Sequence, residues 1–153
     1  MNRGVTLIEM LIVVAIIAVM VGISFPSVSS GLDSLRLITA GDSLASFLNG
    51  ALGRAERRQE AMEITISKAA NTVVLRSSEP GYERRLEMPE GVRIDALLPP
   101  SPSGEEESRT FILYPGGAVP RIGVEIANRK GTRRIIRLDP IKGVPEVARV
   151  EDR

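Results

Sequence analysis

The stretch that decides the fold runs VTLIEMLIVVAIIAVMVGISF, from Val5 to Phe25. Apart from Thr6, Glu9, Gly22 and Ser24, every residue in it is plainly apolar. In a helix that rises 1.5 Å per residue, a segment of this length covers about 31 Å, close to the roughly 30 Å thickness of the hydrocarbon layer of a bilayer. The stretch is therefore long enough to cross a membrane as a helix.

A secretory signal peptide is the competing interpretation. Such a peptide has an apolar region of about 7 to 15 residues, followed by a cleavage site with small residues. Here the apolar run is longer, and the residues that follow Phe25, Pro-Ser-Val, offer no such site. Arg3 and the amino terminus precede the run, whereas the first charge after it is Asp33. The positive-inside rule then predicts a cytoplasmic N-terminus and a C-terminal part on the other side of the membrane.

Glu9 is the one charged residue inside this run. A carboxylate at the centre of a membrane helix costs on the order of 2.5 to 3.5 kcal/mol by insertion scales, and such groups are rare and usually paired. Glu9 lies near one end of the run, which lowers the cost. One interpretation is a side chain that reaches up to the lipid headgroups; the other is a carboxylate that awaits a partner.

The first residues, Met-Asn-Arg-Gly followed by Val-Thr-Leu-Ile-Glu, resemble the class III signal of type IV prepilins and pseudopilins. Resemblance implies that residues 1–4 are a leader, that a prepilin peptidase cuts between Gly4 and Val5, and that the new amine of Val5 is methylated. The sequence departs from the usual pattern at Val5, where the family commonly has phenylalanine. By resemblance, Glu9 would pair with the Val5 amine of an adjacent subunit in a fibre. Because the two residues are one helical turn apart, Glu9 could instead pair with the amine of its own chain.

Composition excludes several kinds of chemistry. The 153 residues include no Cys and no His, so the chain has no thiolate nucleophile, imidazole base, disulfide or common zinc site. With 20 Lys and Arg against 19 Asp and Glu, the net charge is +1 and provides no general field for polyanions. We expect no catalytic residues, no cofactor and no metal, and the acidic run Glu105–Glu107 lacks the alternating ligand spacing of a calcium loop. Paired carboxylates such as Glu79 and Glu83 are not placed in a cleft by any sequence pattern, so an enzyme is not expected.

Beyond the apolar run, the pattern predicts a helical segment and then strands. Gly22 and Pro26 predict a kink or a local interruption, with the end of the helix at Pro26 as the alternative. Asp33 is expected to cap a second helical segment that runs to about Ala61. Its apolar residues recur at intervals of three and four and form one stripe, made by Leu37, Ala40, Leu44, Leu48, Ala51, Leu52 and Ala55.

From Met62 onward the hydrophobic period changes from 3.6 to 2, which is typical of strands. Seven strands are expected over residues 62–67, 73–76, 84–88, 92–97, 110–114, 121–127 and 132–138. Asn128-Arg129-Lys130-Gly131 is expected to connect the last two as a hairpin, with a positive φ at Gly131. We predict an α+β fold in which a long helix packs on a mainly antiparallel sheet. The divisions are a leader (1–4), a membrane and assembly helix (5–26), an amphipathic helix (27–61) and a β-rich domain (62–153) that packs with residues 32–61.

The layout after residue 31 resembles that of the H-type minor pseudopilins of type II secretion and of the FimT-like minor pilins. Four features carry this resemblance: the end of the Ala-rich helix at Ala55-Glu56-Arg57-Arg58, a strand that begins near Met62-Glu63-Ile64-Thr65-Ile66, the segment Phe111-Ile112-Leu113-Tyr114-Pro115-Gly116-Gly117, and the hairpin from Ile122 to Leu138 followed by Gly143. Resemblance implies a subunit in the inner membrane with a periplasmic domain. Its partners would be other pilin-like subunits, the prepilin peptidase, the membrane platform of the assembly machine and inner-membrane lipid.

Two functions are consistent with this resemblance. The leading one is a minor pseudopilin of a type II secretion system, and the alternative is a FimT-like minor pilin of a type IV pilus that binds DNA during uptake. For DNA, the candidate patch consists of Arg129, Lys130, Arg133 and Arg134 around the hairpin, with Arg84 and Arg85 as further cations. The same charges would also discourage edge-to-edge pairing of strands, which is the commoner use. We therefore do not expect nucleic acid to be a main partner.

Overall fold

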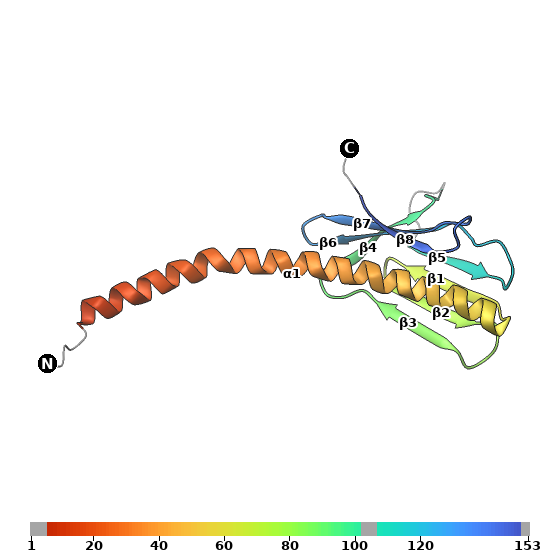
Figure 1. Cartoon of the computed structure of the whole chain (residues 1–153), viewed down its shortest axis with the longest axis horizontal. Coiled ribbons are helices and arrows are strands. Elements are labelled where there is room, and N and C mark those ends of the chain that lie inside the picture. Colours follow the sequence, from red (N-terminus) through yellow and green to blue (C-terminus); the bar gives the residue numbers. More distant parts are fainter. Residues whose placement is uncertain (1–5, 102–106, 151–153) are drawn as a thin grey trace.

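The computed structural model describes residues 6–101 and 107–150, and within residues 23–30 it describes the backbone but not the side chains. One long helix, α1 (Leu7–Arg58), precedes all the strands. Its N-terminal part projects away from the rest of the molecule, whereas its C-terminal part lies along the strands (Figure 1). The shape is that of a rod with a β-rich domain at one end.

Helix α1 is continuous, which corrects two sequence-based predictions. The backbone is helical from Leu7 through Pro26 to Arg58, so no separate segment begins at Asp33 and the helix does not end at Pro26. A proline removes one backbone hydrogen bond, which a helix this long can lose without unwinding. The helix stops at Arg58 rather than Ala61, because Gln59 adopts a left-handed conformation with φ 56°. A bend at Gly22 and Pro26 stays a prediction.

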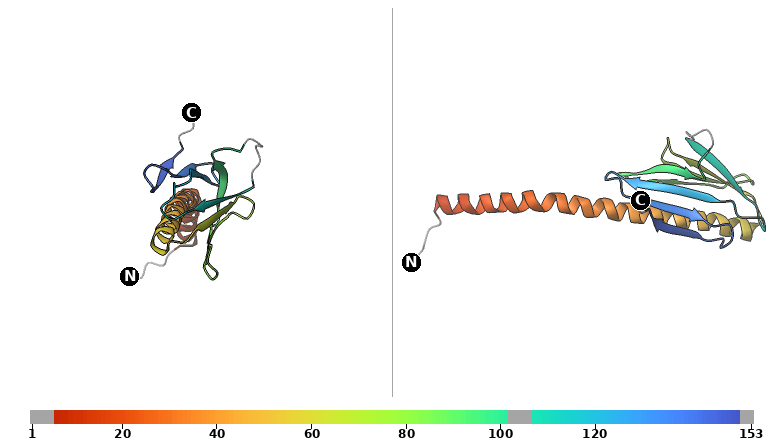
Figure 2. Two further views of the ribbon diagram at one scale, coloured as in Figure 1. Left: turned by 90° about the vertical axis from the view of Figure 1, so that its right-hand side faces the viewer. Right: turned by 90° about the horizontal axis from the view of Figure 1, so that it is seen from above.

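The strands of the described chain form two four-stranded sheets, and all paired strands are antiparallel. We call the first of them sheet A, with the order β3-β2-β1-β5, and the second sheet B, with the order β4-β6-β7-β8. Sheet A contains β1 (Met62–Ser67), β2 (Thr72–Ser77), β3 (Glu83–Glu87) and β5 (Ser108–Leu113). Sheet B contains β4 (Val92–Leu98), β6 (Ile122–Asn128), β7 (Arg133–Leu138) and β8 (Pro145–Arg149). Figure 2 shows the helix beside both sheets.

The predicted α+β class is confirmed, and all seven predicted strands are present within one or two residues of their expected bounds. The hairpin at residues 128–131 is also confirmed, since β6 pairs with β7 and Gly131 has a φ of +81°. Strand β8 was missed. It is an edge strand with no fully buried residue, so its sequence Pro-Glu-Val-Ala-Arg lacks the alternation of apolar side chains that marks a half-buried strand.

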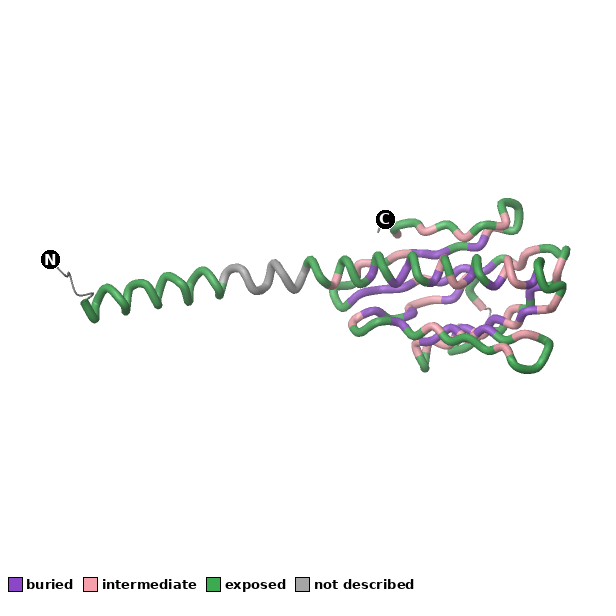
Figure 3. Tube along the Cα trace, turned by 60° about the horizontal axis from the view of Figure 1, so that its bottom comes forward, coloured by how far each residue is buried: buried purple, intermediate pink, exposed green. Residues whose placement is uncertain are grey.

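The core lies between the C-terminal part of α1 and the two sheets. Strands β6, β7 and β8 of sheet B and β1 of sheet A all contact α1. Most of the predicted stripe is buried, namely Leu37, Ala40, Leu44, Leu48, Ala51 and Ala55, each at most 2% exposed. In Figure 3 the N-terminal part of the helix is exposed, and buried residues alternate with exposed ones where the helix meets the strands. The stripe thus serves as the helical wall of the core.

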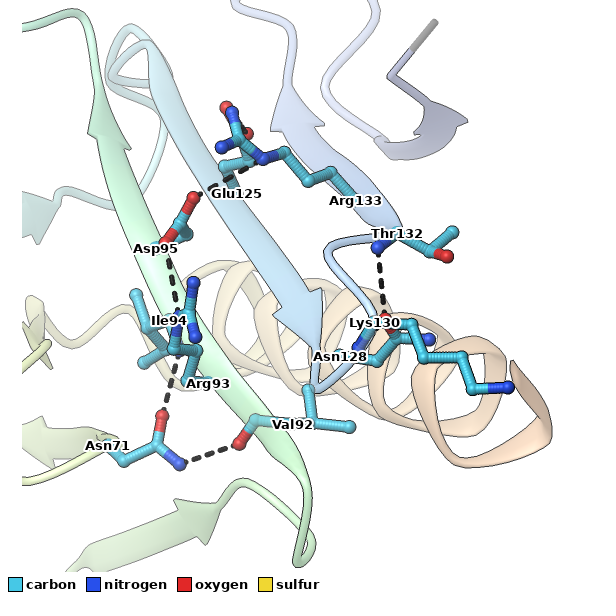
Figure 4. Close-up of polar contacts among 10 residues, drawn as sticks. All are labelled: Asn71, Val92, Arg93, Ile94, Asp95, Glu125, Asn128, Lys130, Thr132 and Arg133. Carbon is cyan, nitrogen blue, oxygen red and sulfur yellow. Dashed lines mark hydrogen bonds and ion pairs between the residues drawn. The ribbon is translucent and has the colours of Figure 1, made fainter. Parts of the chain in front are cut away.

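A side chain in the turn between β1 and β2 ties the two sheets together. Asn71 donates a hydrogen bond from Nδ2 to the carbonyl of Val92 at 2.8 Å and accepts one at Oδ1 from the amide of Ile94, also at 2.8 Å (Figure 4). Both partners belong to β4 in sheet B, whereas Asn71 extends from sheet A. Its φ of 55° is one that asparagine tolerates better than most residues.

Candidate functional site

The start of α1 has a well-defined cap. Thr6 is the N-cap, with extended backbone angles, and its side-chain oxygen accepts a hydrogen bond from the amide of Glu9 at 3.3 Å. Glu9 is therefore the third residue of the helix, where a carboxylate interacts favourably with the positive end of the helix dipole. This cap was not predicted above, although threonine followed three residues later by glutamate is its known sequence signature.

The helix after this cap is apolar on every side and uncovered. The large apolar side chains from Leu7 to Val21 are all exposed, from 44% at Val13 to 81% at Leu7. Glu9 is the only charged residue from residue 6 to residue 22. We call residues 7–22 the apolar rod. An exposed apolar surface of this extent marks a segment that is covered by lipid or by other protein.

Among the residues that the structure describes, no helix is both long enough and apolar enough to cross a bilayer.

Several predicted site residues lie outside the described residues or are only partly described. Gly4 and Val5, which define the predicted cleavage and methylation site, lie outside the described residues. The predicted pairing of Glu9 with the Val5 amine therefore stays a prediction, both within one chain and between chains. Gly22 is described, and no other residue approaches within 4 Å of the position that a Cβ would take there. At Pro26 only the backbone is described, so a kink at these two positions stays a prediction as well.

Two of the four cations of the predicted hairpin patch form ion pairs with carboxylates of the same domain. Arg133 forms ion pairs with Asp95 at 3.5 Å and with Glu125 at 3.3 Å, and Arg129 pairs with Glu90 at 2.5 Å (Figure 4 shows the Arg133 pairs). The hydrogen bond and the positive charge of Arg129 lower the pKa of the Glu90 carboxyl. Two of the four positive charges are thus matched by carboxylates of the same domain.

The other two cations of this patch, Lys130 and Arg134, lie in different places. Side chains of successive strand residues point to opposite faces, so Arg134 projects from the face of sheet B opposite to that of Arg133. The Cδ of Arg134 lies 3.8 Å from the Cβ position of Gly41 in α1, on the face that meets the helix. Lys130 belongs to the loop itself, where its amide donates to Oδ1 of Asn128 at 3.0 Å. The geometry gives no continuous basic surface at the hairpin.

A comparison with protein-family models matches residues 1–25 to the prokaryotic N-terminal methylation motif. The chain carries a type IV pilin-like signal. This signal indicates anchoring in a membrane, processing by a prepilin peptidase and assembly with other pilin subunits. The matched residues include the predicted leader and cleavage position, Glu9 and the apolar rod. The domain that follows has a helix on antiparallel sheets and is consistent with a pilin-like fold. No curated protein and no solved structure matches the chain.

Proposed function

We propose that the chain is a minor pseudopilin of a type II secretion system, of the H type. In this role it is stored in the inner membrane and assembled into a pseudopilus that exports folded proteins. One observation carries the proposal, which is that the type IV pilin-like signal leads directly into a helix whose first part is exposed and apolar all round. The second part of the same helix is anchored in a β-rich domain. A helix of this kind suits both storage in lipid and a bundle of like helices.

Assembly exchanges one apolar environment for another. In the stored subunit, lipid covers the apolar rod, and in the fibre the rods of neighbouring subunits cover it. Because lipid tails and apolar side chains are similarly apolar, moving the rod from lipid into the fibre does not favour one neighbouring subunit over another. In this proposal, Glu9 determines which subunit becomes the neighbour. A carboxylate and an ammonium group are each costly to desolvate, and pairing Glu9 with the Val5 amine of a neighbour recovers part of that cost.

The topology and partners follow from this role. Residues before the rod lie in the cytoplasm, and the β-rich domain lies in the periplasm. The membrane platform of the assembly machine and other pilin-like subunits are the protein partners. The chain acts by structure and not as an enzyme. A FimT-like minor pilin of a type IV pilus is the alternative, and it shares the signal, the rod and the assembly step. Its proposed DNA binding would require a surface other than the hairpin, where carboxylates pair with Arg129 and Arg133.

Processing gives the first test. The protein purified from its native membrane should begin at Val5 and carry one methyl group on the new amine, as measured by intact mass and N-terminal sequencing. A Gly4→Leu variant should remain a precursor in the membrane, because bulk at the residue before the cut obstructs the peptidase. A native protein that begins at Met1, or one released from the membrane without residues 5–26, would contradict the proposal.

Substitution of Glu9 gives the second test. Glu9→Gln removes the charge but keeps the size of the side chain, so membrane insertion and cleavage should be normal while incorporation into fibres falls at least tenfold. Asp42→Asn is the matched control, since it removes one carboxylate from an exposed position of the same helix that lies within the β-rich domain. Equal incorporation of the two variants would argue against a role for Glu9 in assembly.

Strains with the Glu9→Gln and Asp42→Asn variants also distinguish a type II secretion pseudopilus from a type IV pilus. If the chain is a pseudopilin, Glu9→Gln should reduce the amount of exported protein in the medium and leave surface pili and DNA uptake unchanged. Loss of pili or of DNA uptake with normal export would favour the minor pilin. Exported protein, pilus number and transformation frequency are therefore measured in the same strains.

A further inference from the structure

An open pocket of about 300 Å³ lies where the last turns of α1 face strand β3. Three arginines of the helix, Arg54, Arg57 and Arg58, line it together with Arg84 of β3 and the ring of Tyr82. The three helical arginines are spaced at i, i+3 and i+4, which places them on one face of the helix. Arg84 of β3 is paired with Leu75 of β2, so the two side chains project from the same face of sheet A. Both of them line the pocket.

The positive charge in this pocket is only partly matched. Arg54 lies 3.6 Å from Glu60, and its guanidinium is stacked over the ring of Tyr82 at 3.6 Å from the ring centre. Its Nε is buried and has no hydrogen-bond partner among the described residues. Within the described chain, no carboxylate forms an ion pair with Arg57, Arg58 or Arg84. The pocket therefore holds several guanidinium groups and a single acidic partner.

The carboxylates next to these arginines in the sequence have other partners. Glu56, next to Arg57, accepts a hydrogen bond from the amide of Gly116 at 2.9 Å. Glu83, next to Arg84, pairs with Arg76 at 3.0 Å. Glu60, the partner of Arg54, also accepts a hydrogen bond from the hydroxyl of Ser77 at 2.7 Å. Cations in the last turn of a helix do interact favourably with the helix dipole, which accounts for Arg57 and Arg58. That effect does not account for Arg84, which comes from a strand of sheet A and faces the same pocket.

We propose that this pocket binds a short acidic segment of a protein that assembles with the chain. Guanidinium groups match carboxylates with paired hydrogen bonds, and stacking on Tyr82 holds one of them in place before a ligand arrives. The apolar side chains of Phe47 and Leu75 also line the pocket and suit the aliphatic part of glutamate side chains. The occupant is a peptide with two or three adjacent acidic residues.

The surroundings favour a compact anion over a long one. A second hollow of about 470 Å³ shares Ser46, Phe47 and Arg84 with the pocket, but it is also lined by Asp42. A nucleic acid strand that continued from the pocket would meet that carboxylate in one direction and Glu60 beside Arg54 in the other. Since each phosphate of such a strand is charged, these contacts oppose its binding, whereas a short peptide avoids them.

The position of the pocket also disfavours a lipid headgroup, and this step rests on the proposed function. Pro26, at the end of the predicted membrane segment, and Arg54 are separated by 28 residues of continuous helix. At 1.5 Å per residue, this places Arg54 about 42 Å along the helix from that end. The headgroups of the membrane that holds the rod are then out of reach.

The test uses the full chain in detergent and a labelled peptide with the sequence of residues 102–108, Pro-Ser-Gly-Glu-Glu-Glu-Ser, as the acidic probe. Fluorescence anisotropy at low salt should show binding that weakens as salt is raised. A peptide with glutamine in place of the three glutamates should not bind. Arg84→Gln should weaken binding about tenfold, the loss of one charge-assisted contact, and Arg58→Gln is a second variant on the other wall.

Arg85→Gln is the matched control. It removes the same charge from the adjacent residue of the same strand, but Arg85 pairs with Val74 and points to the other face of sheet A. The control should bind the probe as the unaltered chain does, and the unfolding midpoints of all three variants should agree. Equal weakening by Arg84→Gln and Arg85→Gln would overturn the proposal, because it would show a diffuse field instead of a site.

Competition identifies the chemistry of the occupant. Inorganic phosphate, a ten-residue oligothymidylate and vesicles with anionic lipid are added in separate arms. Displacement of the peptide only by a second acidic peptide supports the proposal. Tighter binding of the oligonucleotide, of phosphate or of the vesicles than of the peptide would overturn it, as would no binding of the peptide. None of these outcomes touches cleavage at Gly4 or the role of Glu9, so the proposed function is tested separately.

Discussion

The two parts of α1 have the same backbone conformation but different surroundings. In the apolar rod, residues 7–22, the large apolar side chains point outward on all sides and remain exposed. In the part from residue 37 to residue 55, one stripe is buried against the sheets, and most of the polar residues are exposed. Helix formation thus reveals little about how a helix is stabilised. The second part is held by its own domain, and the rod requires lipid or other subunits.

Replacement of one leucine in each part gives the largest expected difference. Leu48 is fully buried, so Leu48→Ala should lower the free energy of unfolding of the domain by about 2 to 5 kcal/mol. Leu11 is 61% exposed, so Leu11→Ala should leave that free energy unchanged. Denaturant unfolding of the full chain in detergent, followed by a probe in the β-rich domain, measures both. An equal loss in the two variants would mean that the rod and the domain unfold as one unit.

Removing the contact of Asn71 between sheets A and B should have an intermediate effect on the free energy of unfolding of the domain. Asn71→Ala removes both hydrogen bonds between the β1–β2 turn and β4, and it places alanine at a positive φ. We expect a loss of about 2 kcal/mol, from the unpaired backbone groups of Val92 and Ile94 and from the backbone strain. Asn49→Ala, at an exposed position of α1, is the control and should be close to neutral. Unfolding midpoints for both variants would decide whether this tie between the sheets matters.

Glycine replacements give the smallest and most selective comparison. Apart from the neighbouring residues and backbone of the helix itself, a Cβ at Gly50 or at Gly22 would meet nothing within 4 Å, so both sites accept alanine. Alanine is a better helix former than glycine by about 0.8 to 1 kcal/mol. Gly50→Ala should therefore raise the free energy of unfolding of the domain by roughly this amount. Gly22→Ala should not, because the rod does not belong to the packed domain, and a gain at both sites would contradict that separation.

Short-range patterns were sufficient to predict most elements of the fold. Alternating side chains marked seven strands, and the spacing of Leu37, Leu44 and Leu48 marked the buried stripe. Strand β8 escaped because it is half exposed at an edge. The division into two sheets also escaped, since pairing between strands such as β1 and β5 joins residues far apart in the chain, and no local pattern specifies it.

Candidate sites were predicted with unequal success for a similar reason. The N-terminal signal is a contiguous motif, so its residues could be recognised together and the family comparison matches the same region. The basic patch at the hairpin was predicted from cations that are close together in the sequence. Two of its arginines pair with Asp95 of β4 and with Glu90 of the loop before β4, and the sequence does not show these pairs. The pocket of Arg54 and Arg84 combines a helix with a strand about thirty residues later, and only folding brings them together.

By itself, the sequence determined that this protein has a long apolar segment with one carboxylate, a processing signal before it and a strand-rich part after it. These features depend on residue type and spacing along the chain, which folding does not change. Only the tertiary structure decided which charges are matched, how the strands divide into two sheets and which arginines face a common pocket. Those outcomes depend on contacts between distant residues, because electrostatic pairing and burial follow distances in space and not positions in the chain.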